Sequence, residues 1–316
     1  MDMNFKTACV TGGAGFIGSH LVRELLRRSM HVTVIDDLSV GRRDNVPAGA
    51  EFVHGDVLDP QIARIAARSE LVFHLAARVA IRSSFEFITE DVTTNVVGTA
   101  SVLRAIATAP ERRVRRLLFA SSMAVYADAD APVPLAETFR LEPISPYGVS
   151  KLAAERLVLQ VCAQTGIDAC VLRLFNTYGP GQAYSPYVGV VTIFSRQMAA
   201  GERPAIFGDG LQCRDFVHVD DIVQGFMRAM ARARPGAVFN IGSGSGLTVR
   251  ELHERIADVL GYRAAPLFAP AVAGEVRHSI ADIGRAAREL GYQPTRRFQE
   301  SVADVVREVV GGNHGH

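Results

Sequence analysis

Short apolar runs alternate with longer amphipathic stretches through the first half of the chain. Most of the short runs are apolar at every position, which is typical of parallel strands that helices cover on both faces. Strands are expected at residues 8–11, 31–35, 51–54, 71–75, 117–121 and 169–174, and helices at 17–29, 91–109 and 146–165. This alternation predicts repeated βαβ units, and therefore an α/β fold with a doubly wound parallel sheet of the Rossmann type.

The pattern changes after Asn176, where turn-rich segments separate the apolar runs. Helices are expected at 190–200, 220–234, 248–260 and 298–310, with one strand at 237–242. We interpret this half as a smaller C-terminal substrate-binding lobe that returns some segments to the main sheet. The predicted division assigns residues 1–175 and roughly 214–243 to the sheet domain, and residues 176–213 and 244–316 to the smaller lobe.

The composition is that of a folded globular protein, with 48% hydrophobic and 21% charged residues, which excludes disordered and collagen-like chains. The 34 basic and 33 acidic residues give a net charge of +1, so no overall field favours nucleic acid or an anionic membrane as a partner. The four cysteines form no Cys-x-x-Cys pair, and we expect free thiols. Since the sequence has no secretion signal and no run of about eighteen apolar residues, it predicts a cytoplasmic protein. The run at 218–221 is interpreted as a helix start capped by Asp220, and no metal site is expected.

A glycine-rich turn, VTGGAGFIG, follows the first expected strand and opens the first expected helix. It satisfies G-x-G-x-x-G through Gly13, Gly15 and Gly18, and G-x-x-G-x-x-G through Gly12, Gly15 and Gly18. Glycines are needed because the backbone must approach a pyrophosphate closely, where amides and the positive end of the helix meet its charge. Asp36 ends the second strand, where a carboxylate can hold ribose hydroxyls and repel a 2′-phosphate. The sequence therefore predicts NAD(H) rather than NADP(H) as the cofactor.

Further cofactor contacts are expected at the carboxyl ends of the strands, where a dinucleotide lies on a doubly wound sheet. Asp56 and Val57 are placed to flank the adenine, and the small residues Ala76 and Ala77 let the backbone pass the phosphates. Asn95 lies in an expected helix, where it either contacts the cofactor or is a buried amide that bonds neighbouring backbone. The remaining cofactor candidates are Phe16, Ile17, Asp37, Ser39, Leu75, Ala120, Tyr147 and Lys151.

A tyrosine and a lysine stand one helical turn apart in the motif SPYGVSK. Ser145 and Pro146 are typical of a helix start, which places Tyr147 and Lys151 on one face of the helix. A phenol with a pKa of about 10 is a poor base at neutral pH, but an adjacent ammonium group and an oxidised nicotinamide lower its pKa. We predict that Tyr147 is the catalytic base and Lys151 its electrostatic partner. An exposed helix pair is the alternative.

Two serines follow the fifth expected strand directly, in the motif SSMAVY. One hydroxyl at this place can hydrogen-bond the substrate oxygen on which Tyr147 acts. We assign that role to Ser122, with Ser121 as a second candidate. The alternative is a serine pair that only forms a turn.

Several motifs occur in one order between Lys6 and Asp282: TGGAGFIGSH, HLAA, SSMAVY, SPYGVSK, RLFNTYGP, GDGLQCRDFVHVDD and GEVRHSIAD. In these motifs the chain resembles the extended short-chain dehydrogenase/reductase family, in particular its NAD-dependent nucleotide-sugar epimerases and dehydratases. Within that family it is most similar to the UDP-glucose 4-epimerases. The resemblance implies an isomerase that binds NAD and a UDP-sugar and inverts C4 through a transient 4-keto sugar. UDP-glucose and UDP-galactose are the expected substrate pair.

A few positions bear on the subtype within that family. The pair that begins at Ser122 stands where 4,6-dehydratases carry Asp-Glu, and Ala124 stands where decarboxylases carry Glu, so both activities are disfavoured. Ala183 stands where UDP-glucuronate 4-epimerases place an arginine, which favours a neutral hexose unless Arg82 or Arg196 takes that role. The alternatives are a UDP-glucuronate or UDP-N-acetylhexosamine 4-epimerase, a dehydratase or decarboxylase, and a non-catalytic NAD-sensing protein.

The resemblance also implies an NAD site on the sheet domain and a UDP-sugar site on the smaller lobe. Phe207 would stack on the uracil, Asn176 would bond the diphosphate, and Gln212 would reach the ribose. Arg214 and Arg277 would clamp the diphosphate, because forked donors match its paired oxygens. The other expected contacts are Ser84 and Ser122 on the sugar side and the amides of Val190 and Val191 at a helix start.

Ordinary structural roles are the alternatives for three of these residues. Phe207 could belong to the core, Arg214 could pair with Asp215, and Arg277 could pair with Glu275. Relatives dimerise through the helices expected at 91–109 and 146–165, and the resemblance therefore implies a homodimer.

Overall fold

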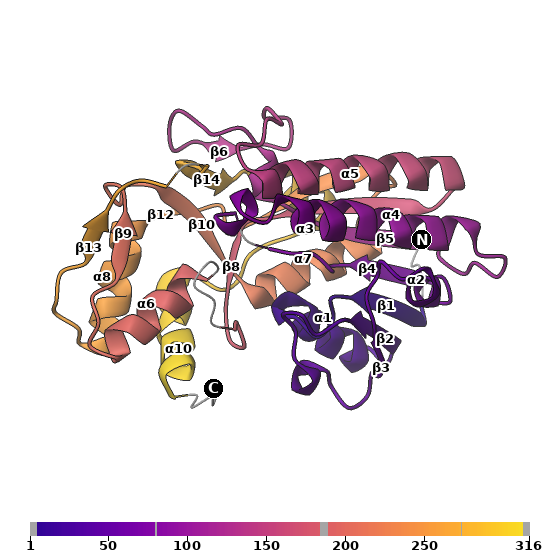
Figure 1. The fold of residues 1–316 in the computed structure, drawn as a ribbon, viewed down its shortest axis with the longest axis horizontal. Coiled ribbons are helices and arrows are strands. Elements are labelled where there is room, and N and C mark those ends of the chain that lie inside the picture. The colour runs from indigo at the N-terminus through magenta and orange to yellow at the C-terminus, as the bar shows by residue number, and fades with distance from the viewer. Residues whose placement is uncertain (1–4, 80, 184–188, 273, 312–316) are drawn as a thin grey trace.

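The computed structural model describes residues 5–79, 81–183, 189–272 and 274–311. At its centre lies a parallel sheet of seven strands in the order β11-β7-β5-β4-β1-β2-β3 (Figure 1). The strands are β1 (Thr7–Thr11), β2 (His31–Asp36), β3 (Glu51–His54), β4 (Leu71–His74), β5 (Arg116–Ser122), β7 (Asp168–Leu174) and β11 (Ala237–Ile241). All neighbouring pairs are parallel, and the order reverses between β1 and β4. This is the doubly wound sheet that the sequence predicts.

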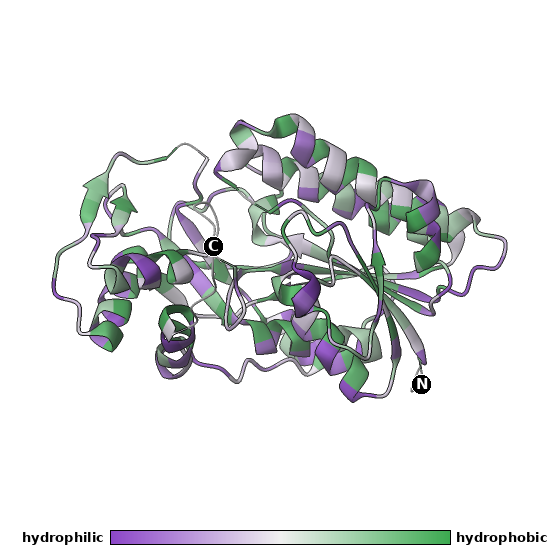
Figure 2. Ribbon diagram, turned by 60° about the horizontal axis from the view of Figure 1, so that its bottom comes forward, coloured by the Kyte–Doolittle hydropathy of each residue, from purple (hydrophilic) through white to green (hydrophobic). Residues whose placement is uncertain are grey.

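Helices cover both faces of this sheet because its strands are apolar on both sides. One face carries α1 (Phe16–Arg27), α7 (Val219–Arg232) and α9 (Gly284–Leu290), and the other carries α2 (Pro60–Ala66), α4 (Thr99–Thr108) and α5 (Pro146–Thr165) (Figure 1). Alternate strand residues supply two separate cores, Val10 and Phe73 on the first face and Cys9 and Val72 on the second. Figure 2 shows hydrophobic and hydrophilic residues along each covering helix, as one buried side requires.

The helix expected at 91–109 is present from Ile88 to Thr108, but it is not α-helical throughout. A short helix α3 (Ile88–Val92) leads into a π-helical segment, η3 (Thr93–Gly98), before α4 begins. The wider turn places Asn95 in the interior, where its amide donates to the Ser150 hydroxyl at 2.9 Å. A π-helical turn is common where a helix serves a functional site, and this one lies against the start of α5.

A second sheet builds the smaller lobe, in the order β12-β10-β14-β6 with β8 paired to β10. Its strands are β6 (Pro134–Leu135), β8 (Asn176–Tyr178), β10 (Cys213–His218), β12 (Gly246–Thr248) and β14 (His278–Ala281), beside a two-stranded ribbon of β9 (Ala205–Phe207) and β13 (Leu267–Ala269). The helices α6 (Val190–Ala199), α8 (Val249–Leu260) and α10 (Phe298–Gly311) pack together around a third core, away from the large sheet (Figure 1). Three short 3₁₀ segments complete the fold, η1 (Arg43–Asn45), η2 (Ser83–Phe85) and η4 (Met123–Val125).

The smaller sheet contains two strands, β10 and β6, from parts of the chain that the sequence analysis assigned to the large-sheet domain. The stretch 214–243, expected with the large sheet, is divided: β11 and α7 join the large sheet, whereas β10 pairs with β8, β12 and β14 in the smaller one. The antiparallel strand β12 pairs directly with β10 and joins it to the smaller sheet. The strand β6 comes from the first half of the chain and pairs with β14. Apart from this correction, the division into two lobes stays a prediction.

Local details refine other expectations. Helix α7 begins at Val219, and its cap is His218, whose Nδ1 accepts the Asp220 amide at 3.2 Å; the expected cap, Asp220, lies inside the helix. The four cysteines are free and buried. Among the described residues, no helix is both long and apolar enough to cross a membrane, and no three or more metal-ligating side chains gather at one place.

Candidate active site

The glycine-rich turn after β1 forms a cradle that only glycine fits. Gly12 has a φ of 73°, and a Cβ there would lie 2.7 Å from the Ala76 amide nitrogen. A Cβ on Gly18 would collide with the Gly12 carbonyl oxygen. Helix α1 begins directly after Gly15, which caps it without a side-chain hydrogen bond, so its first amides point toward the turn. This cradle suits a pyrophosphate, since close backbone approach and helix amides are what that group requires.

Asp36 is held beside this cradle at the end of β2. Its two carboxylate oxygens accept the amides of Ala14 and Leu38, each at 2.9 Å. Burial raises the pKa of the Asp36 carboxyl, and the two amide hydrogen bonds oppose that rise. The nearby Arg42 is engaged by Asp44 at 2.6 Å. The predicted contact of Asp36 with the ribose hydroxyls of NAD stays a prediction.

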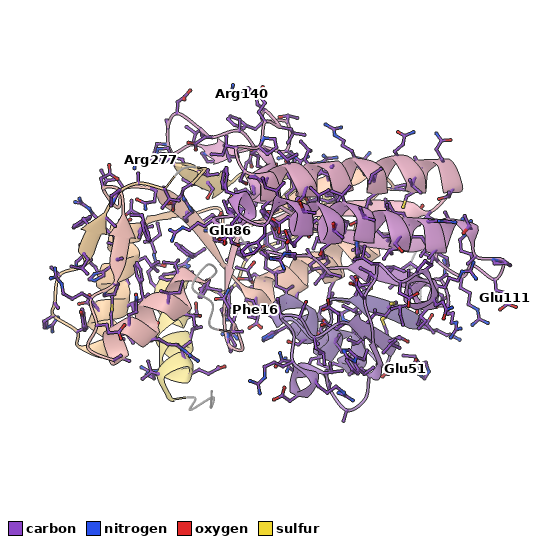
Figure 3. The ribbon with its side chains drawn as sticks, viewed as in Figure 1. Phe16, Glu51, Glu86, Glu111, Arg140 and Arg277 are labelled. Carbon is purple, nitrogen blue, oxygen red and sulfur yellow. The ribbon has the colours of Figure 1, made fainter. Side chains whose placement is uncertain are left out.

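The other predicted cofactor residues occupy the same edge of the sheet. The Ala76 amide donates to the Thr11 hydroxyl at 3.3 Å, next to Gly12. Val57 is buried and faces Gly98 in η3. Phe16 and Glu86 mark the region where the two lobes meet in Figure 3. Two side chains act within their own turns: Asp37 accepts the Ser39 amide and hydroxyl, and Asp56 accepts the Leu58 amide. Ile17, Leu75 and Ala77 are half-buried, and Ala120 lies in β5.

Asn95 and His74 form polar contacts beneath the cradle. The Asn95 amide bonds both backbone groups of Arg78, at 2.9 and 3.2 Å, in addition to Ser150. These are the bonds that the structural alternative for Asn95 expects, and its direct cofactor contact stays a prediction. The sequence analysis did not single out His74, which sits between the hydroxyls of Thr11 and Thr99 at 2.7 and 2.9 Å. Burial lowers its pKa to about 3, so this histidine is neutral.

Tyr147 and Lys151 lie on the inner side of α5. The Ser145 hydroxyl caps the helix by accepting the Gly148 amide at 3.1 Å. A Cβ on Gly148 would collide with the Ala124 carbonyl oxygen, so this glycine lets the helix start approach the segment that follows Ser122. Tyr147 and Lys151 are 5% and 3% exposed, which rules out the exposed-pair alternative.

The ionisation of this pair differs from the sequence prediction. Burial raises the pKa of the Tyr147 phenol to about 12, a hydrogen bond with Ser122 opposes the rise, and the charge of Asp91 adds to it. The predicted downward shift depends on the charge of an oxidised nicotinamide as well as on that of Lys151, and it stays a prediction. The main cause of the rise is burial of the phenol itself. Burial also lowers the pKa of Lys151 to about 7, and the charge of Glu155 opposes that shift only in part. The ammonium form on which the prediction depends is therefore itself disfavoured in this setting. Its Nζ lies 4.4 Å from the centre of the Phe119 ring.

The two serines after β5 separate into different roles. Ser122 faces Tyr147 and also accepts the Ala124 amide at 3.2 Å. Ser121 points to the opposite face of the strand, as adjacent strand residues do, and its hydroxyl donates to Glu155 at 3.0 Å. Ser121 is therefore excluded as the second candidate for the substrate oxygen.

The predicted nucleotide contacts gather on the smaller lobe, where most of them already have protein partners. Arg214 is buried and pairs with Glu275 at 3.1 Å, rather than with Asp215. Arg277 pairs with Asp209 through two hydrogen bonds of 2.7 and 2.8 Å, rather than with Glu275. Each arginine is therefore paired with an acid, as its structural alternative expects, but the acid differs from the expected one in both cases. Arg277 lies at the upper side of the smaller lobe in Figure 3.

Phe207 is half-buried at the end of β9, and it is not a core residue. The Arg82 guanidinium covers its ring at 4.4 Å and pairs with Glu275 at 3.6 Å. Gln212 donates to the Phe207 carbonyl oxygen at 2.9 Å. Ser84 is buried and donates to the Ile81 carbonyl oxygen at 2.6 Å. Asn176 begins β8, and Val190 and Val191 open α6 after Gly189, which supplies no side-chain cap.

The sequence analysis missed Asp128, an acid that links the two lobes. Its Oδ1 accepts the backbone amide of Arg277 at 2.7 Å. The position follows the SSMAVY motif by two residues, but nothing in the local sequence reveals a partner 149 residues away. Glu155 was missed too, although an acid eight residues after Tyr147 on one helix face was a usable signal.

Comparison with known proteins agrees with this geometry. The sequence model of the NAD dependent epimerase/dehydratase family matches residues 8–242. The chain belongs to this family. NAD is accordingly its cofactor.

Individual family members resemble the chain along nearly its whole length. A UDP-glucose 4-epimerase of Mycolicibacterium smegmatis is 38% identical over 304 residues, covering 94% of this chain and 96% of the relative. The crystal structure of a UDP-glucose 4-epimerase from Thermotoga maritima with UDP-glucose has a TM-score of 0.91 at 36% identity, covering 96% of this chain and 98% of that one. The UDP-glucose 4-epimerase of Thermus thermophilus, in complex with NAD, has a TM-score of 0.90 at 32% identity, covering 97% and 99%.

Proposed function

We propose that the chain is an NAD-dependent UDP-sugar 4-epimerase that interconverts UDP-glucose and UDP-galactose. The observation that carries the proposal is the buried pair of Tyr147 and Lys151, with the half-buried Ser122 against the phenol, in a chain that also forms a glycine cradle for the cofactor. The similarity to UDP-glucose 4-epimerases over nearly the whole chain supports the same reaction.

The chemistry at C4 falls to three side chains. Tyr147 removes the proton from the 4-hydroxyl group, while Ser122 hydrogen-bonds the same oxygen and aligns it. When bound, NAD⁺ supplies reversible oxidation of the carbon that carries this hydroxyl. Lys151, if protonated, stabilises the tyrosinate form that accepts the proton. The 4-keto sugar then rotates within the site, and Tyr147 returns the proton to the oxygen of the inverted centre. Because oxidation is reversed within one turnover, the net reaction is an isomerisation.

The nucleotide is held by the smaller lobe in this proposal. Phe207 stacks on the uracil, and Arg214 and Arg277 bind the diphosphate in exchange for Glu275 and Asp209. Stacking on the face of Phe207 that Arg82 covers replaces the guanidinium by the base. A diphosphate suits this exchange, since paired arginine donors match paired oxygens.

A panel of substrates tests the proposal. Purified protein is incubated separately with UDP-glucose, UDP-galactose, UDP-N-acetylglucosamine and UDP-glucuronate, and the products are separated by chromatography. We expect interconversion of the first two. Turnover of UDP-glucuronate alone would identify a UDP-glucuronate 4-epimerase, and release of a 4-keto or deoxy sugar would identify a dehydratase. Absence of turnover with every sugar, despite bound NAD, would leave the NAD-sensing alternative.

We also propose a homodimer formed through α3, η3 and α5. Ile88, Val92, Val97 and Val149 are 41–53% exposed on these elements. Ile88, Val92 and Val149 line one apolar groove of about 360 Å³ beside the start of α5. Apolar area of this kind on neighbouring helices is typical of a subunit interface. Light scattering after size exclusion tests the dimer, and Val149→Glu is expected to shift it to monomer. The free, buried cysteines agree with a reducing compartment, and we propose the cytoplasm.

A further inference from the structure

Helix α5 carries a third polar residue on the face of Tyr147 and Lys151. Glu155 follows Lys151 by one turn and is 1% exposed. Its Oε2 accepts the Ser121 hydroxyl at 3.0 Å and Arg173 Nε at 3.1 Å, and its Oε1 accepts Arg173 Nη2 at 2.5 Å. One carboxylate thus joins α5 to β5 and to β7.

The partner of this carboxylate is itself fully engaged. Arg173 Nη1 donates to the Tyr126 hydroxyl and to the Glu137 carbonyl oxygen, both at 3.0 Å. The Tyr126 hydroxyl donates to Asn240 Oδ1 at 2.6 Å. A buried ion pair adds little net stability compared with well-packed apolar residues. Net stability alone therefore does not account for this network of buried polar groups, which indicates a second role.

The place of Ser121 in the chain indicates that role. It precedes Ser122 in β5, and the two side chains point to opposite faces of the strand. A hydrogen bond that fixes Ser121 to α5 also fixes the backbone from which Ser122 reaches Tyr147. The same carboxylate is the nearest anion along α5 to the amine of Lys151, which burial otherwise deprives of its charge.

We propose that Glu155 is a positioning residue for the proposed epimerase reaction. Through the Ser121 hydroxyl it sets Ser122 against Tyr147, and through its charge it retains the ammonium form of Lys151. Only the kinetic part of this inference rests on the proposed function.

The charges around Lys151 leave this task to Glu155. On β4, His74 is neutral and bonded to two hydroxyls. On β5, the Phe119 ring lies against the amine. On α3, Asp91 is paired with Arg78 at 3.2 Å, and its charge acts on Tyr147, whereas the acid that acts on Lys151 is Glu155. On β7, Arg173 is a second cation. Removal of the Glu155 charge therefore lowers the pKa of Lys151 further below about 7.

The kinetic experiment separates positioning from folding. Ser121→Ala removes the hydroxyl and leaves the Glu155–Arg173 pair intact, and we expect kcat to fall about tenfold with KM for the UDP-sugar and bound NAD unchanged, because small misplacements of reacting groups are costly. Ser121→Thr keeps a hydroxyl and is expected to recover most of the rate. Ser69→Ala, at another buried serine, is the matched control. A wild-type kcat in Ser121→Ala, a parallel loss of NAD, or no recovery in Ser121→Thr would overturn the positioning role.

A second measurement needs no turnover. The chain has two lysines, Lys6 and Lys151, so carbon-13 labelling at the ε-carbon gives two NMR signals, and Lys6→Arg identifies them. We expect Glu155→Gln to lower the pKa of Lys151 by about one unit, a tenfold change in its protonation ratio, while Glu155→Asp stays close to wild type. An unchanged or raised pKa in Glu155→Gln overturns the electrostatic role. If that variant does not fold, the Ser121 comparison still decides the proposal. Inactivity of the wild type with every UDP-sugar contradicts the proposed function, and the lysine titration then decides this inference.

Discussion

The two halves of the candidate site are built in different ways. In the sheet domain, Tyr147 and Lys151 are buried, and close backbone contacts shape their surroundings. The cradle excludes any Cβ at Gly12 and Gly18, and α5 approaches the segment after Ser122 through Gly148. In the smaller lobe, the groups assigned to the nucleotide are charged and paired with one another, as Arg277 is with Asp209. The chemical half is preorganised, which keeps reacting groups aligned. The nucleotide half holds exchangeable ion pairs that a diphosphate can replace.

The largest effect is expected from the buried phenol. Tyr147→Phe removes the proton acceptor and keeps the ring, so turnover of UDP-glucose should fall by about 10³-fold or more. Bound NAD and the affinity for UDP, measured by calorimetry, should stay within about twofold of wild type, since neither depends on this hydroxyl. Near-normal turnover would show that Tyr147 is not the proton acceptor, and the assignment of the chemistry to the sheet domain would then be wrong.

The second-largest effect is expected from a change in the glycine-rich turn. Gly12→Ala places a Cβ 2.7 Å from the Ala76 amide nitrogen at a φ of 73°. We expect NAD affinity to fall by about 100-fold, because the displaced turn no longer lets its backbone approach the pyrophosphate closely. Gly166→Ala is the matched control, because its φ is 68° and nothing lies within 4 Å. Titration of the cofactor-free protein with NAD measures both. Equal losses in the two variants would mean that backbone strain, not close approach, limits binding.

A smaller effect is expected in the smaller lobe. Arg277→Gln removes a cation whose side chain is 42% exposed, and the affinity for UDP should fall about tenfold because one charge-assisted contact is lost. Bound NAD should not change. Arg234→Gln, which breaks a surface pair with Glu289, serves as the control. A loss of NAD together with UDP in Arg277→Gln would show that the two halves are not separable.

The smallest effect concerns stability and pH. The pKa of Lys151 is lowered from 10.5 to about 7, so between these values the unfolded chain binds more protons than the folded one. The contribution of Lys151 to stability therefore rises with pH across this window. Lys151→Met removes the cost of burying the charge, and we expect its Tm to exceed that of wild type by about 2–4 °C at pH 6.5. The difference should shrink toward pH 9.5. A Tm difference that does not change with pH would show that altered packing, rather than the charge of Lys151, causes it.

The sequence predicted those parts that local patterns determine. The apolar runs placed the strands of the large sheet, and Ser145 and Pro146 placed the start of α5 at the residue where the structure has it. What it missed depends on distant partners. The π-helical turn needs Ser150 and Arg78 around Asn95, and the acids that hold Arg214 and Arg277 lie 61 and 68 residues away from them. The upward pKa shift of Tyr147 follows from burial, which a motif does not reveal.

The contact between Asp128 and the backbone of Arg277, together with the pairing of β6 with β14, has a mechanical consequence. Both join the stretch that follows Ser122 to the strand that follows Arg277. An outward swing of the smaller lobe would have to break these bonds and would pull on the backbone near Ser122. The orientation of the smaller lobe and the position of Ser122 are therefore coupled through the stretch that carries Asp128 and β6.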